Sequence, residues 1–413
     1  MPFAYDLAVG AYHAAVRAAA PFNTKARAWV AGREGLWDRL EARKEQLRGC
    51  LWMHCASVGE FEQGRPVLEA IKAARPDLPV LLTFFSPSGY EARKDYPLAT
   101  HVDYLPPDSA ENAGRLVDMV GPRAAIFVKY EFWYRHLRAL KEHGVPVFLV
   151  SGIFRPDQPF FKWYGGAWRR MLGCYARICV QDEASKDLLA GVGITNVTVT
   201  GDTRFDRVAV IVGENHELDE AARFRNSGDR PVLVCGSTWP ADDDLIRTAC
   251  AGLGGRRPLF IVAPHELSAP GLDELRPKYA KRYRNWSDEH FPDDLEALIV
   301  DRMGLLASLY KYGDIAYVGG GFTDGIHSLL EAAAWGKPVI FGPKHTKFAE
   351  AKGLIDAGGG FQVRNADDLR AVLDRLLGDA DALARAGEAA GKYVRERVGA
   401  TERAAGQILG RIG

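Results

Sequence analysis

A carboxylate follows the first strand-like run of the chain. In HCASVGEFEQG, residues 54–64, Ser57 and Gly59 are typical of a tight turn from a strand into a helix, and Glu60 falls in the first turn of that helix. A carboxylate at the rim of a crevice can act as a general base. Acidic residues also favour first helical turns because of the helix dipole, so a capping role for Glu60 is the alternative.

The next strand-like run ends in a turn that is rich in hydroxyl groups. In FFSPSGYE, residues 84–91, Ser86, Ser88 and Gly89 offer hydroxyls and backbone amides at a helix start. Such a turn suits the carboxylate or phosphate of a ligand, and a simple capped turn is the alternative.

A second carboxylate lies in KYEFW, residues 129–133, after the run AAIFV. Burying a lone charge is costly, so Glu131 is not expected to point into the core without a partner. We expect that Glu131 either lines the crevice or pairs with a basic residue.

Three consecutive glycines give the strongest sign of a nucleotide site. In DIAYVGGGFTDGIHSLLEAAAWGKPVIFG, residues 314–342, a strand runs into Gly319, Gly320 and Gly321. Glycines allow the backbone to approach an oxyanion closely. The segment lacks a full GxGxxG followed about twenty residues later by an acid, so a dehydrogenase is disfavoured.

A helix is predicted from about Gly325, and it carries His327, Ser328 and Glu331. The positive end of its dipole would face a phosphate. Side chains four residues apart share a helical face, so we expect His327 and Glu331 to reach one nucleotide. An ordinary helical histidine is the alternative.

Two shorter motifs follow strands in the second half of the chain, GSTWP at residues 236–240 and APHE at residues 263–266. Ser237, Thr238, His265 and Glu266 could contact the nucleotide, and capping or turn roles explain them as well.

Two series of apolar runs must position these motifs. The first is LWMHCAS, PVLLTFF, AAIFVKY, VPVFLVS, ARICVQ and NVTVTG, and the second is PVLVCGS, PLFIVAP, EALIVD, DIAYVGGG and KPVIFG. Continuous apolar strands that alternate with helical segments predict parallel sheets covered by helices. Two Rossmann-like lobes would place the site where the carboxyl ends of their strands meet in a crevice.

The chain of 413 residues is long enough for two domains. We predict an α/β protein with one Rossmann-like domain over residues 36–205, a polar linker over 206–230, and a second Rossmann-like domain over 231–413. The last forty or so residues, rich in Ala, Arg and Glu, are expected to form helices that close the second lobe or pack back on the first.

The composition excludes some classes of protein. With 53 basic and 53 acidic residues and 47% hydrophobic residues, neither disorder nor nucleic-acid binding is indicated. Six cysteines lie mostly in apolar runs without CxxC spacing, which predicts reduced core thiols and fits a reducing compartment. They are Cys50, Cys55, Cys174, Cys179, Cys235 and Cys250. No cluster of metal ligands such as DxD stands out in a crevice loop, so we expect a metal-independent reaction.

Residues 1–35 are predicted to associate with a membrane surface. Within residues 4–19, a polar face is expected to lie opposite an apolar stripe. The polar face holds Asp6, His13 and Arg17, and the stripe holds Tyr5, Val9, Tyr12 and Val16. No apolar run is long enough to span a bilayer, and the pattern of a cleaved signal peptide is missing, which argues against export.

Basic residues continue this segment without an intervening acid, namely Arg17, Lys25, Arg27 and Arg33. Such a series favours an anionic lipid surface. An ordinary helix packed against the first lobe is the alternative.

Taken in this order, the segments resemble the 3-deoxy-D-manno-octulosonic acid (Kdo) transferase family. The likeness rests on SVGE, the hydroxyl-rich turn, the Glu-aromatic-Trp element, GSTWP, VDRMGLLASLYKYGDIAYVGGGF and GIHSLLEAAAWGKPVIFGP. It also includes FNTKARAWVAGREG and so spans nearly the whole chain.

The resemblance implies a GT-B fold, with two Rossmann-like domains facing each other across a cleft. It implies an inverting glycosyltransferase of lipopolysaccharide biosynthesis that moves Kdo from CMP-Kdo to a lipid A precursor, a tetraacyldisaccharide phosphate. The acceptor is expected in residues 36–205 and the CMP-sugar in 231–413. The implied location is the cytoplasmic face of the bacterial inner membrane, with peripheral or monotopic attachment.

The resemblance also implies roles for particular residues. Glu60 matches the catalytic base and Glu131 a second essential acid, whereas the segment from Gly319 to Glu331 matches the cytidine nucleotide site, to which Ser237 is added. The two sugars are expected near Ser57, Gly59, Ser86, Ser88 and His265. The chain departs from many members at Ser328, where they carry Asn, and at APHELS, where they read PRHPER.

Two rival functions follow from the same features. One is another GT-B glycosyltransferase, or an epimerase, that uses a UDP-sugar. The other is a non-catalytic two-lobe sugar-binding protein, which the missing signal peptide disfavours. The oligomeric state is not predicted.

Overall fold

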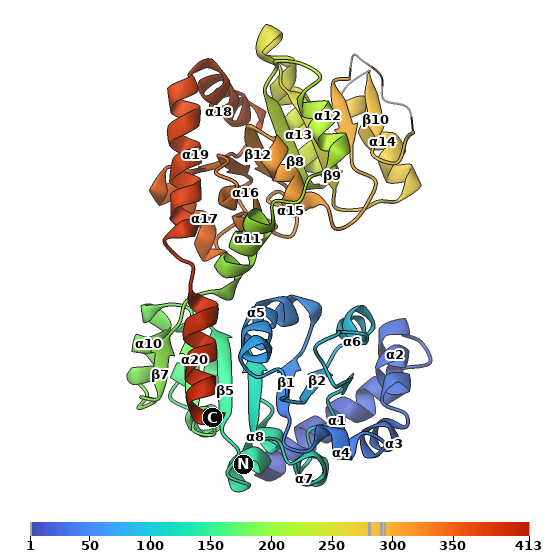
Figure 1. Ribbon diagram of the computed structural model, residues 1–413, viewed down its shortest axis with the longest axis vertical. Helices are drawn as coiled ribbons and strands as arrows, with labels where there is room; N and C mark the ends of the chain where they lie inside the picture. The colour runs from blue at the N-terminus through green and yellow to red at the C-terminus, as the bar shows by residue number, and fades with distance from the viewer. Residues whose placement is uncertain (1, 280–281, 290–291, 293–294, 413) are drawn as a thin grey trace. The chain divides into compact units, whose positions relative to one another are not determined.

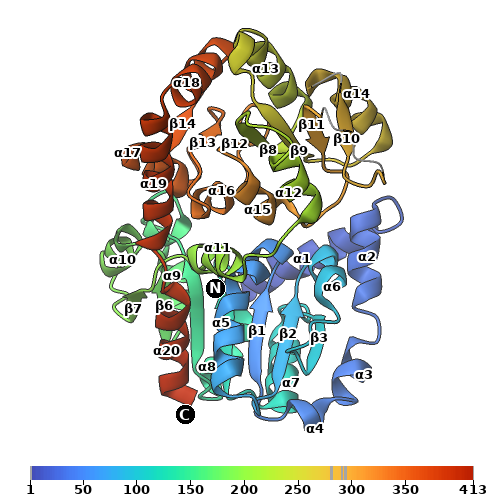
Figure 2. The same ribbon diagram turned by 45° about the horizontal axis from the view of Figure 1, so that its top comes forward.

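The protein consists of two compact units, seen in a computed structural model that describes residues 2–279, 282–289, 292 and 295–412. The first unit comprises Met1–Asp206 together with Val398–Gly413, and the second comprises Arg207–Arg397. Each unit is built on a parallel seven-stranded sheet flanked by helices (Figures 1 and 2).

The sheet of the first unit has the strand order β3-β2-β1-β4-β5-β6-β7. Its strands are β1 (Leu51–Cys55), β2 (Val80–Phe84), β3 (His101–Tyr104), β4 (Ala124–Val128), β5 (Val147–Gly152), β6 (Arg177–Val180) and β7 (Val197–Val199). Every residue of β1, β2 and β4 is buried, as continuous apolar runs predict for a sheet covered on both faces.

The helices of the first unit cover this sheet. They are α1 (Pro2–Ala19), α2 (Thr24–Gly32), α3 (Leu36–Glu41), α4 (Lys44–Leu47), α5 (Val58–Ala74), α6 (Pro87–Arg93), α7 (Ala110–Val120), α8 (Tyr134–Glu142), η1 (Pro159–Phe161), α9 (Gly166–Leu172), α10 (Glu183–Ala190) and α20 (Ala400–Ile412). Helix α11 (Thr203–Glu214) begins in the first unit and continues into the second.

The sheet of the second unit has the order β10-β11-β9-β8-β12-β13-β14. Its strands are β8 (Val232–Thr238), β9 (Leu259–Pro264), β10 (Tyr283–Asn285), β11 (Ala297–Ile299), β12 (Ile315–Val318), β13 (Val339–Phe341) and β14 (Gly360–Gln362). Its helices are α12 (Asp219–Arg225), α13 (Pro240–Ala251), η2 (Gly254–Arg256), α14 (Ala269–Tyr279), α15 (Leu306–Leu309), η3 (Tyr310–Tyr312), α16 (Leu330–Ala334), α17 (Ala349–Ala357), α18 (Ala366–Gly378) and α19 (Ala380–Arg395).

Both sheets reverse their winding direction once. In the first unit the chain moves from β1 through β2 to β3 and then crosses to β4 on the other side of β1. In the second unit the same reversal separates β8 from β12. Ligands of such sheets bind at the carboxyl ends of the strands that flank the reversal.

The unit boundaries differ from the predicted domains. Helix α20, the red helix beside α5 in Figure 1, belongs to the first unit and not to a domain spanning 231–413. Its residues Ile408 and Ile412 share a core with Phe61 and Ile71 of α5, because its apolar face completes the cover of that helix.

The segment predicted as a linker, residues 206–230, is largely helical. It contains most of α11 and all of α12, and Phe224 of α12 is fully buried. Its polar residues cover the outer faces of these helices, so a polar composition alone did not indicate a linker.

The N-terminal segment packs on the first unit instead of standing apart from residues 36–205. Helix α1 spans the predicted range, and the hydroxyl of Tyr5 donates a hydrogen bond to Asp108, which is 1% exposed. Arg135 forms an ion pair with Asp6. His13, predicted on the polar face, is partly buried against Trp29, whereas Tyr12 of the predicted stripe is 47% exposed.

Two further properties concern the whole described chain. Among the described residues, no helix is both long and apolar enough to span a membrane. All six cysteines are free thiols, and five of them are buried, which confirms the prediction of reduced core thiols.

Candidate active site

Glu60 lies at the carboxyl end of β1, beside the reversal of the first sheet. Ser57 caps α5 by accepting a hydrogen bond from the Glu60 amide at 3.4 Å, and the Glu60 carboxylate accepts one from the Ala56 amide at 2.6 Å. The capping role is therefore real. Within the residues that the structure describes, the second carboxylate oxygen of this partly buried side chain has no hydrogen-bond partner, so a base role is compatible with the capping role.

The environment of Glu60 favours its protonated form. Burial, followed by the charge of Glu131, raises the pKa of Glu60 to about 7, against the lowering effects of the Ala56 amide and Lys129. A carboxyl group with a pKa near neutrality is well matched to general-base catalysis.

Lys129 is the nearby basic group at the end of β4. Its backbone has φ 66°, an uncommon conformation for a residue with a side chain, and its amide donates to the Val150 carbonyl at 2.9 Å. Burial and the charge of Arg204 lower the pKa of Lys129. The end of β4 therefore places a partly buried cation close to Glu60.

Glu131 follows Lys129 and is paired, which was one of the two arrangements predicted for it. Its side chain is buried, with the residue 7% exposed, and its Oε2 lies 3.0 Å from Nε2 of His54. The same oxygen accepts a hydrogen bond from Nε1 of Trp133, and the Tyr175 hydroxyl donates to its backbone carbonyl at 2.5 Å. These contacts hold the carboxylate in one orientation.

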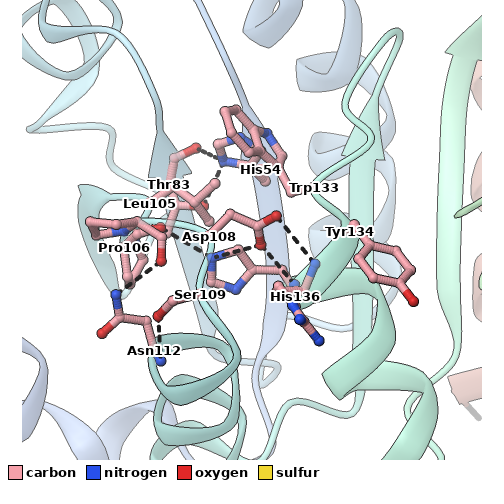
Figure 3. A network of polar contacts seen from close by, with 12 residues as sticks. His54, Thr83, Leu105, Pro106, Asp108, Ser109, Asn112, Trp133, Tyr134 and His136 are labelled. Atoms are coloured by element: carbon pink, nitrogen blue, oxygen red, sulfur yellow. Dashed lines mark hydrogen bonds and ion pairs between the residues drawn. The ribbon is translucent and has the colours of Figure 1, made fainter. Parts of the chain in front are cut away.

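His54 continues a chain of hydrogen bonds into the sheet. Its Nδ1 lies 3.0 Å from the hydroxyl and 3.0 Å from the carbonyl of Thr83 on the neighbouring strand β2. Nε1 of Trp52 donates to the Thr83 hydroxyl at 2.8 Å. Figure 3 shows His54 bonded to Thr83, with Trp133 beside it. The carboxylate of Glu131 is thus held by a series of buried polar groups.

The hydroxyl-rich turn is a capped helix start. The Ser86 hydroxyl accepts from the Gly89 amide at 3.1 Å and from the Ser88 hydroxyl at 3.4 Å. Gly89 must be small, because a Cβ there would lie 2.7 Å from the Phe84 ring. The structure therefore realises the simple capped turn, and Gly59 is exposed at the preceding turn.

The triple glycine follows β12, beside the reversal of the second sheet. A Cβ at Gly319 would lie 2.4 Å from the Ser237 carbonyl, and one at Gly321 would lie 2.6 Å from Gly342. Gly320 has φ 90°, and its Cβ would lie 2.4 Å from the Gly325 carbonyl. These glycines permit close contact between parts of the protein itself, and the approach of this backbone to an oxyanion stays a prediction.

Asp242 explains why the Gly320 amide is not free. Its buried carboxylate accepts hydrogen bonds from the Gly320 amide at 2.9 Å, the Trp239 amide at 3.0 Å and the Tyr317 hydroxyl at 2.8 Å. The Gly319 amide donates to the Gly236 carbonyl at 2.9 Å. Asp242 therefore joins the loop after β8 to the loop after β12.

The helix predicted from about Gly325 is wrong. Helix α16 begins at Leu330, so His327 and Ser328 lie in an irregular segment and Glu331 alone is helical. Gly325 has φ 128°, and the Gly325 amide bonds back to the Gly320 carbonyl, which excludes a helical start there. His327 and Glu331 therefore do not share a helical face.

His327 joins two other rings at the same edge of the sheet. The ring centroids of His327 and His265 are 4.7 Å apart, and His265 stacks on Trp239 at 4.4 Å. Nε1 of Trp239 donates to Nε2 of His327 at 3.5 Å. Burial and the neighbouring His265 lower the pKa of His327, which favours a neutral imidazole. The loops after β8, β9 and β12 thus bring three planar side chains together.

The other residues predicted for the nucleotide site differ in backbone conformation and exposure. Ser237 has φ 51° at the end of β8, Thr238 is 2% exposed, and Glu266 is exposed. Burial raises the pKa of Glu331 to about 7, against the lowering effect of Arg207. Glu331 can therefore exchange a proton near neutral pH.

Several residues of both sites were not predicted. His54 and Trp133 lie within the quoted motifs, as does Trp239, but no role was given to them. Asp242 stands at the third position of α13, where an acid that bonds back to the N-cap amide is a recognisable signal. Thr83 could not have been found, because nothing in an apolar strand indicates a cross-strand bond.

Comparisons with known proteins concern the family of the chain. Residues 32–207 match the family model described as 3-Deoxy-D-manno-octulosonic-acid transferase (kdotransferase). The chain is 29% identical over 384 residues to the 3-deoxy-D-manno-octulosonic acid transferase of Bordetella pertussis, covering 86% of each chain. It is also 29% identical over 346 residues to the enzyme of that name from Aquifex aeolicus, covering 81% of this chain and 88% of that one.

A solved structure extends the comparison to the fold. The UDP-GlcNAc 2-epimerase from Neisseria meningitidis bound to UDP-GlcNAc superposes with a TM-score of 0.61 at 15% identity, covering 88% of this chain and 99% of that one. This likeness concerns the fold alone and confirms the predicted GT-B type. The sequence matches go further: residues 32–207 match the Kdo transferase family model, the chain is similar to Kdo transferases over most of its length, and it is a glycosyltransferase.

Proposed function

We propose that this enzyme transfers Kdo from CMP-Kdo to a lipid A precursor, a lipid-linked glucosamine disaccharide phosphate, with inversion at the anomeric carbon. The observation that carries the proposal is Glu60. It lies at the sheet reversal of the first unit with a pKa raised to about 7, next to the buried and oriented Glu131.

The reaction assigns one proton transfer to Glu60. Glu60 takes the proton of an acceptor hydroxyl as the hydroxyl oxygen attacks the anomeric carbon of Kdo. The new carbon–oxygen bond forms on the face opposite the nucleotide, the bond from that carbon to the CMP phosphate breaks, and CMP departs with the electron pair. Attack on the opposite face accounts for inversion.

The second unit is proposed to hold the nucleotide. The stack of Trp239, His265 and His327 offers flat surfaces for a base or ribose at the end of the sheet where ligands of this fold bind. Ser237, Ser328 and Glu331 are proposed to lie around it. Gly319 and Gly320 would shape this site without donating to the phosphate, because their amides are already bonded.

We also propose that the step needs no metal ion. Asp242 is a buried acid bonded to the nucleotide loops, and its carboxylate already accepts hydrogen bonds from three protein donors. A metal would have to displace them. Addition of EDTA should therefore leave the rate unchanged, and loss of activity that Mg²⁺ restores would contradict this part of the proposal.

The deciding assay is release of CMP from CMP-Kdo with and without the lipid-linked disaccharide. Acceptor-dependent release is expected. The same assay with UDP-sugars tests the rival glycosyltransferase or epimerase, and consumption of a UDP-sugar in place of CMP-Kdo would overturn the proposal. Binding of sugars without consumption of any donor would favour the non-catalytic rival. The variant Glu60→Gln should bind CMP normally and release none.

We further propose that the enzyme attaches to the anionic cytoplasmic face of the inner membrane, because its acceptor is a lipid. The turn between α1 and α2 exposes 92% of Phe22, with Lys25 and Arg27 close by in the chain. Phe22→Ser should reduce sedimentation with anionic vesicles and leave activity on a detergent-dispersed acceptor intact. Vesicle binding that is unchanged and insensitive to salt would contradict attachment there.

A further inference from the structure

Arg33 places a guanidinium group among aromatic rings in the first unit. Its central carbon lies 3.9 Å from the ring centroid of Trp29, 4.8 Å from that of Tyr104 and 5.4 Å from that of Phe85. Arg33 follows the last residue of α2, so the packing of α2 on the sheet fixes its position. The predicted role of Arg33 at a lipid surface does not fit this partly buried setting.

The charge of Arg33 has no acidic partner among the residues that the structure describes. Asp103 contributes to its electrostatic surroundings, but both oxygens of Asp103 are bonded to Arg39, at 2.7 and 2.9 Å. Burial lowers the pKa of Arg33 to about 9, which still leaves the group charged at neutral pH. A desolvated charge without a counter-ion is unfavourable, and an anionic ligand would neutralise it.

Arg33 also keeps unused hydrogen-bond donors. Within the described chain, Nε donates to the Leu105 carbonyl at 3.1 Å, Nη1 to the Trp29 carbonyl at 3.2 Å and Nη2 to the Phe85 carbonyl at 3.0 Å. One N–H on each terminal nitrogen remains. These carbonyls hold the guanidinium rigidly without cancelling its charge.

The indole of Trp29 supplies an independent sign of a ligand. Trp29 is 7% exposed, yet its Nε1 has no hydrogen-bond partner in the part of the chain that the structure describes. A buried donor without a partner is rare in proteins and calls for an acceptor. The Trp29 ring is also the one that lies nearest to the Arg33 guanidinium.

An aromatic wall connects Arg33 with Glu131. The Phe85 ring, which faces Arg33, stacks on Trp133 with centroids 5.0 Å apart and planes at 30°. Trp133 in turn donates to the Glu131 carboxylate. Flat aromatic faces of this kind suit the apolar faces of sugar rings.

We propose that Arg33 and the Trp29 indole N–H bind a phosphate group of the acceptor, whose sugar extends along Phe85 and Trp133 towards Glu131. This inference rests on the proposed function, because it takes the first unit as the acceptor unit. A phosphate offers several acceptor oxygens and the charge that Arg33 lacks, and arginine binds phosphate with more than one N–H. The phosphate of the donor nucleotide is assigned to the second unit.

The test compares two acceptors that differ only in this phosphate. The full-length enzyme is assayed for CMP release from CMP-Kdo with the phosphorylated lipid-linked disaccharide and with the same compound after phosphatase treatment. Wild-type KM should rise by roughly tenfold or more when the phosphate is removed, as expected for loss of a charged hydrogen bond. Arg33→Gln should raise KM for the phosphorylated acceptor similarly and make the two acceptors nearly equal.

Matched variants separate binding from folding. Arg397→Gln is the control, because Arg397 also lies over an aromatic ring, 3.9 Å from the centroid of Tyr393, and donates to the Tyr393 carbonyl at 2.9 Å, yet it belongs to the second unit. This variant should keep the full phosphate effect. Trp29→Phe keeps a smaller aromatic ring and removes the indole N–H, so it should reduce the phosphate effect in part. If Arg33→Gln does not fold, Trp29→Phe and competition by inorganic phosphate against the phosphorylated acceptor in the wild type decide the question.

Three results would overturn the proposal. They are a wild-type enzyme that turns over both acceptors equally, an Arg33→Gln variant that retains the phosphate effect, and a Trp29→Phe variant with an unchanged effect together with no competition by phosphate. Absence of CMP release with both acceptors would instead overturn the proposed function itself. The separate effects on KM and kcat also distinguish the two roles of Arg33. A phosphate-binding role raises KM for the phosphorylated acceptor, whereas a merely structural role would lower kcat for both acceptors alike.

Discussion

Nε2 of His54 lies 3.0 Å from Oε2 of Glu131, and this contact joins β1 to the loop after β4 across the reversal of the first sheet. Both side chains are buried, so the pair is shielded from water. The contact fixes the direction of the Glu131 carboxylate, which in turn acts on Glu60 through its charge.

Replacing His54 should therefore damage turnover more than nucleotide binding. His54→Ala leaves a buried carboxylate with one fewer donor, at a cost of about 1–3 kcal/mol. We expect kcat to fall by about tenfold or more, whereas the affinity for CMP measured by calorimetry stays within error. His54→Gln, which can still donate to Glu131, should recover part of the loss, and an unimpaired His54→Ala enzyme would contradict the role of this contact.

The pH dependence of the rate should follow Glu60. As the base, Glu60 must be ionised, so kcat/KM should rise as the pH passes about 7. The charge of Glu131 contributes to the raised pKa of Glu60. In Glu131→Gln that charge is gone, the pKa of Glu60 falls, and the acidic limb of the profile should move to lower pH. If the acidic limb stays at the same pH in Glu131→Gln, the charge of Glu131 does not control the pKa of Glu60.

The same pKa predicts a stability effect. Because the pKa of Glu60 is raised from 4.5 to about 7 on folding, its contribution to stability is present below pH 4.5 and is lost as the pH rises through about 7. Glu60→Gln keeps a carbonyl oxygen for the Ala56 amide and carries no charge. We expect its free energy of unfolding, measured with denaturant, to exceed that of the wild type by about 1 kcal/mol at pH 8. At pH 4 the two free energies should be equal.

Asp242 should be essential for the second unit. Asp242→Ala would leave the Gly320 amide, the Trp239 amide and the Tyr317 hydroxyl without an acceptor, at a cost of about 2–4 kcal/mol. Urea unfolding measures this loss. Asp244→Ala is the control, because Asp244 lies in the same helix but is 55% exposed, and it should change little.

The ring stack should determine affinity for the nucleotide. Trp239→Ala and His327→Ala each remove a planar surface from the loops after β8 and β12, and we expect CMP binding to weaken about tenfold in calorimetry. His345→Ala provides the comparison, since this partly buried histidine is bonded to Gln362 at 2.8 Å outside the stack. Unchanged affinity in both stack variants would place the nucleotide elsewhere.

Much of the fold could be predicted, because the central strands are buried on both faces and read as continuous apolar runs. Strand β3 escaped the prediction because its sequence HVDY alternates apolar and polar residues, and its buried Asp103 is compensated by Arg39, which lies far away in the chain. Strands β10 and β14 were also missed, because their sequences YRN and GFQ contain no apolar run.

For the site, the sequence predicted several candidate residues but not which of them contact one another. Glu60 and Glu131 were found because acids are conspicuous after apolar strands. Their relationship was not found, because His54 lies inside an apolar strand and its partners come from β2 and the loop after β4. The false helix at Gly325 arose because local residue types favoured a helix start, whereas tertiary hydrogen bonds bend the backbone there.

The return of α20 to the first unit affects how the chain is completed during synthesis. Residues 398–413 supply Ala404, Ile408 and Ile412 to the core around α5, and the Asp206 carboxylate accepts hydrogen bonds from the amides of Gly399 and Thr401. Translation proceeds from the N-terminus, so the unit that leaves the ribosome first is finished last. A fragment that stops at residue 207 would expose one side of α5, and a ribosome-bound chain must keep that surface from aggregating until the final helix emerges.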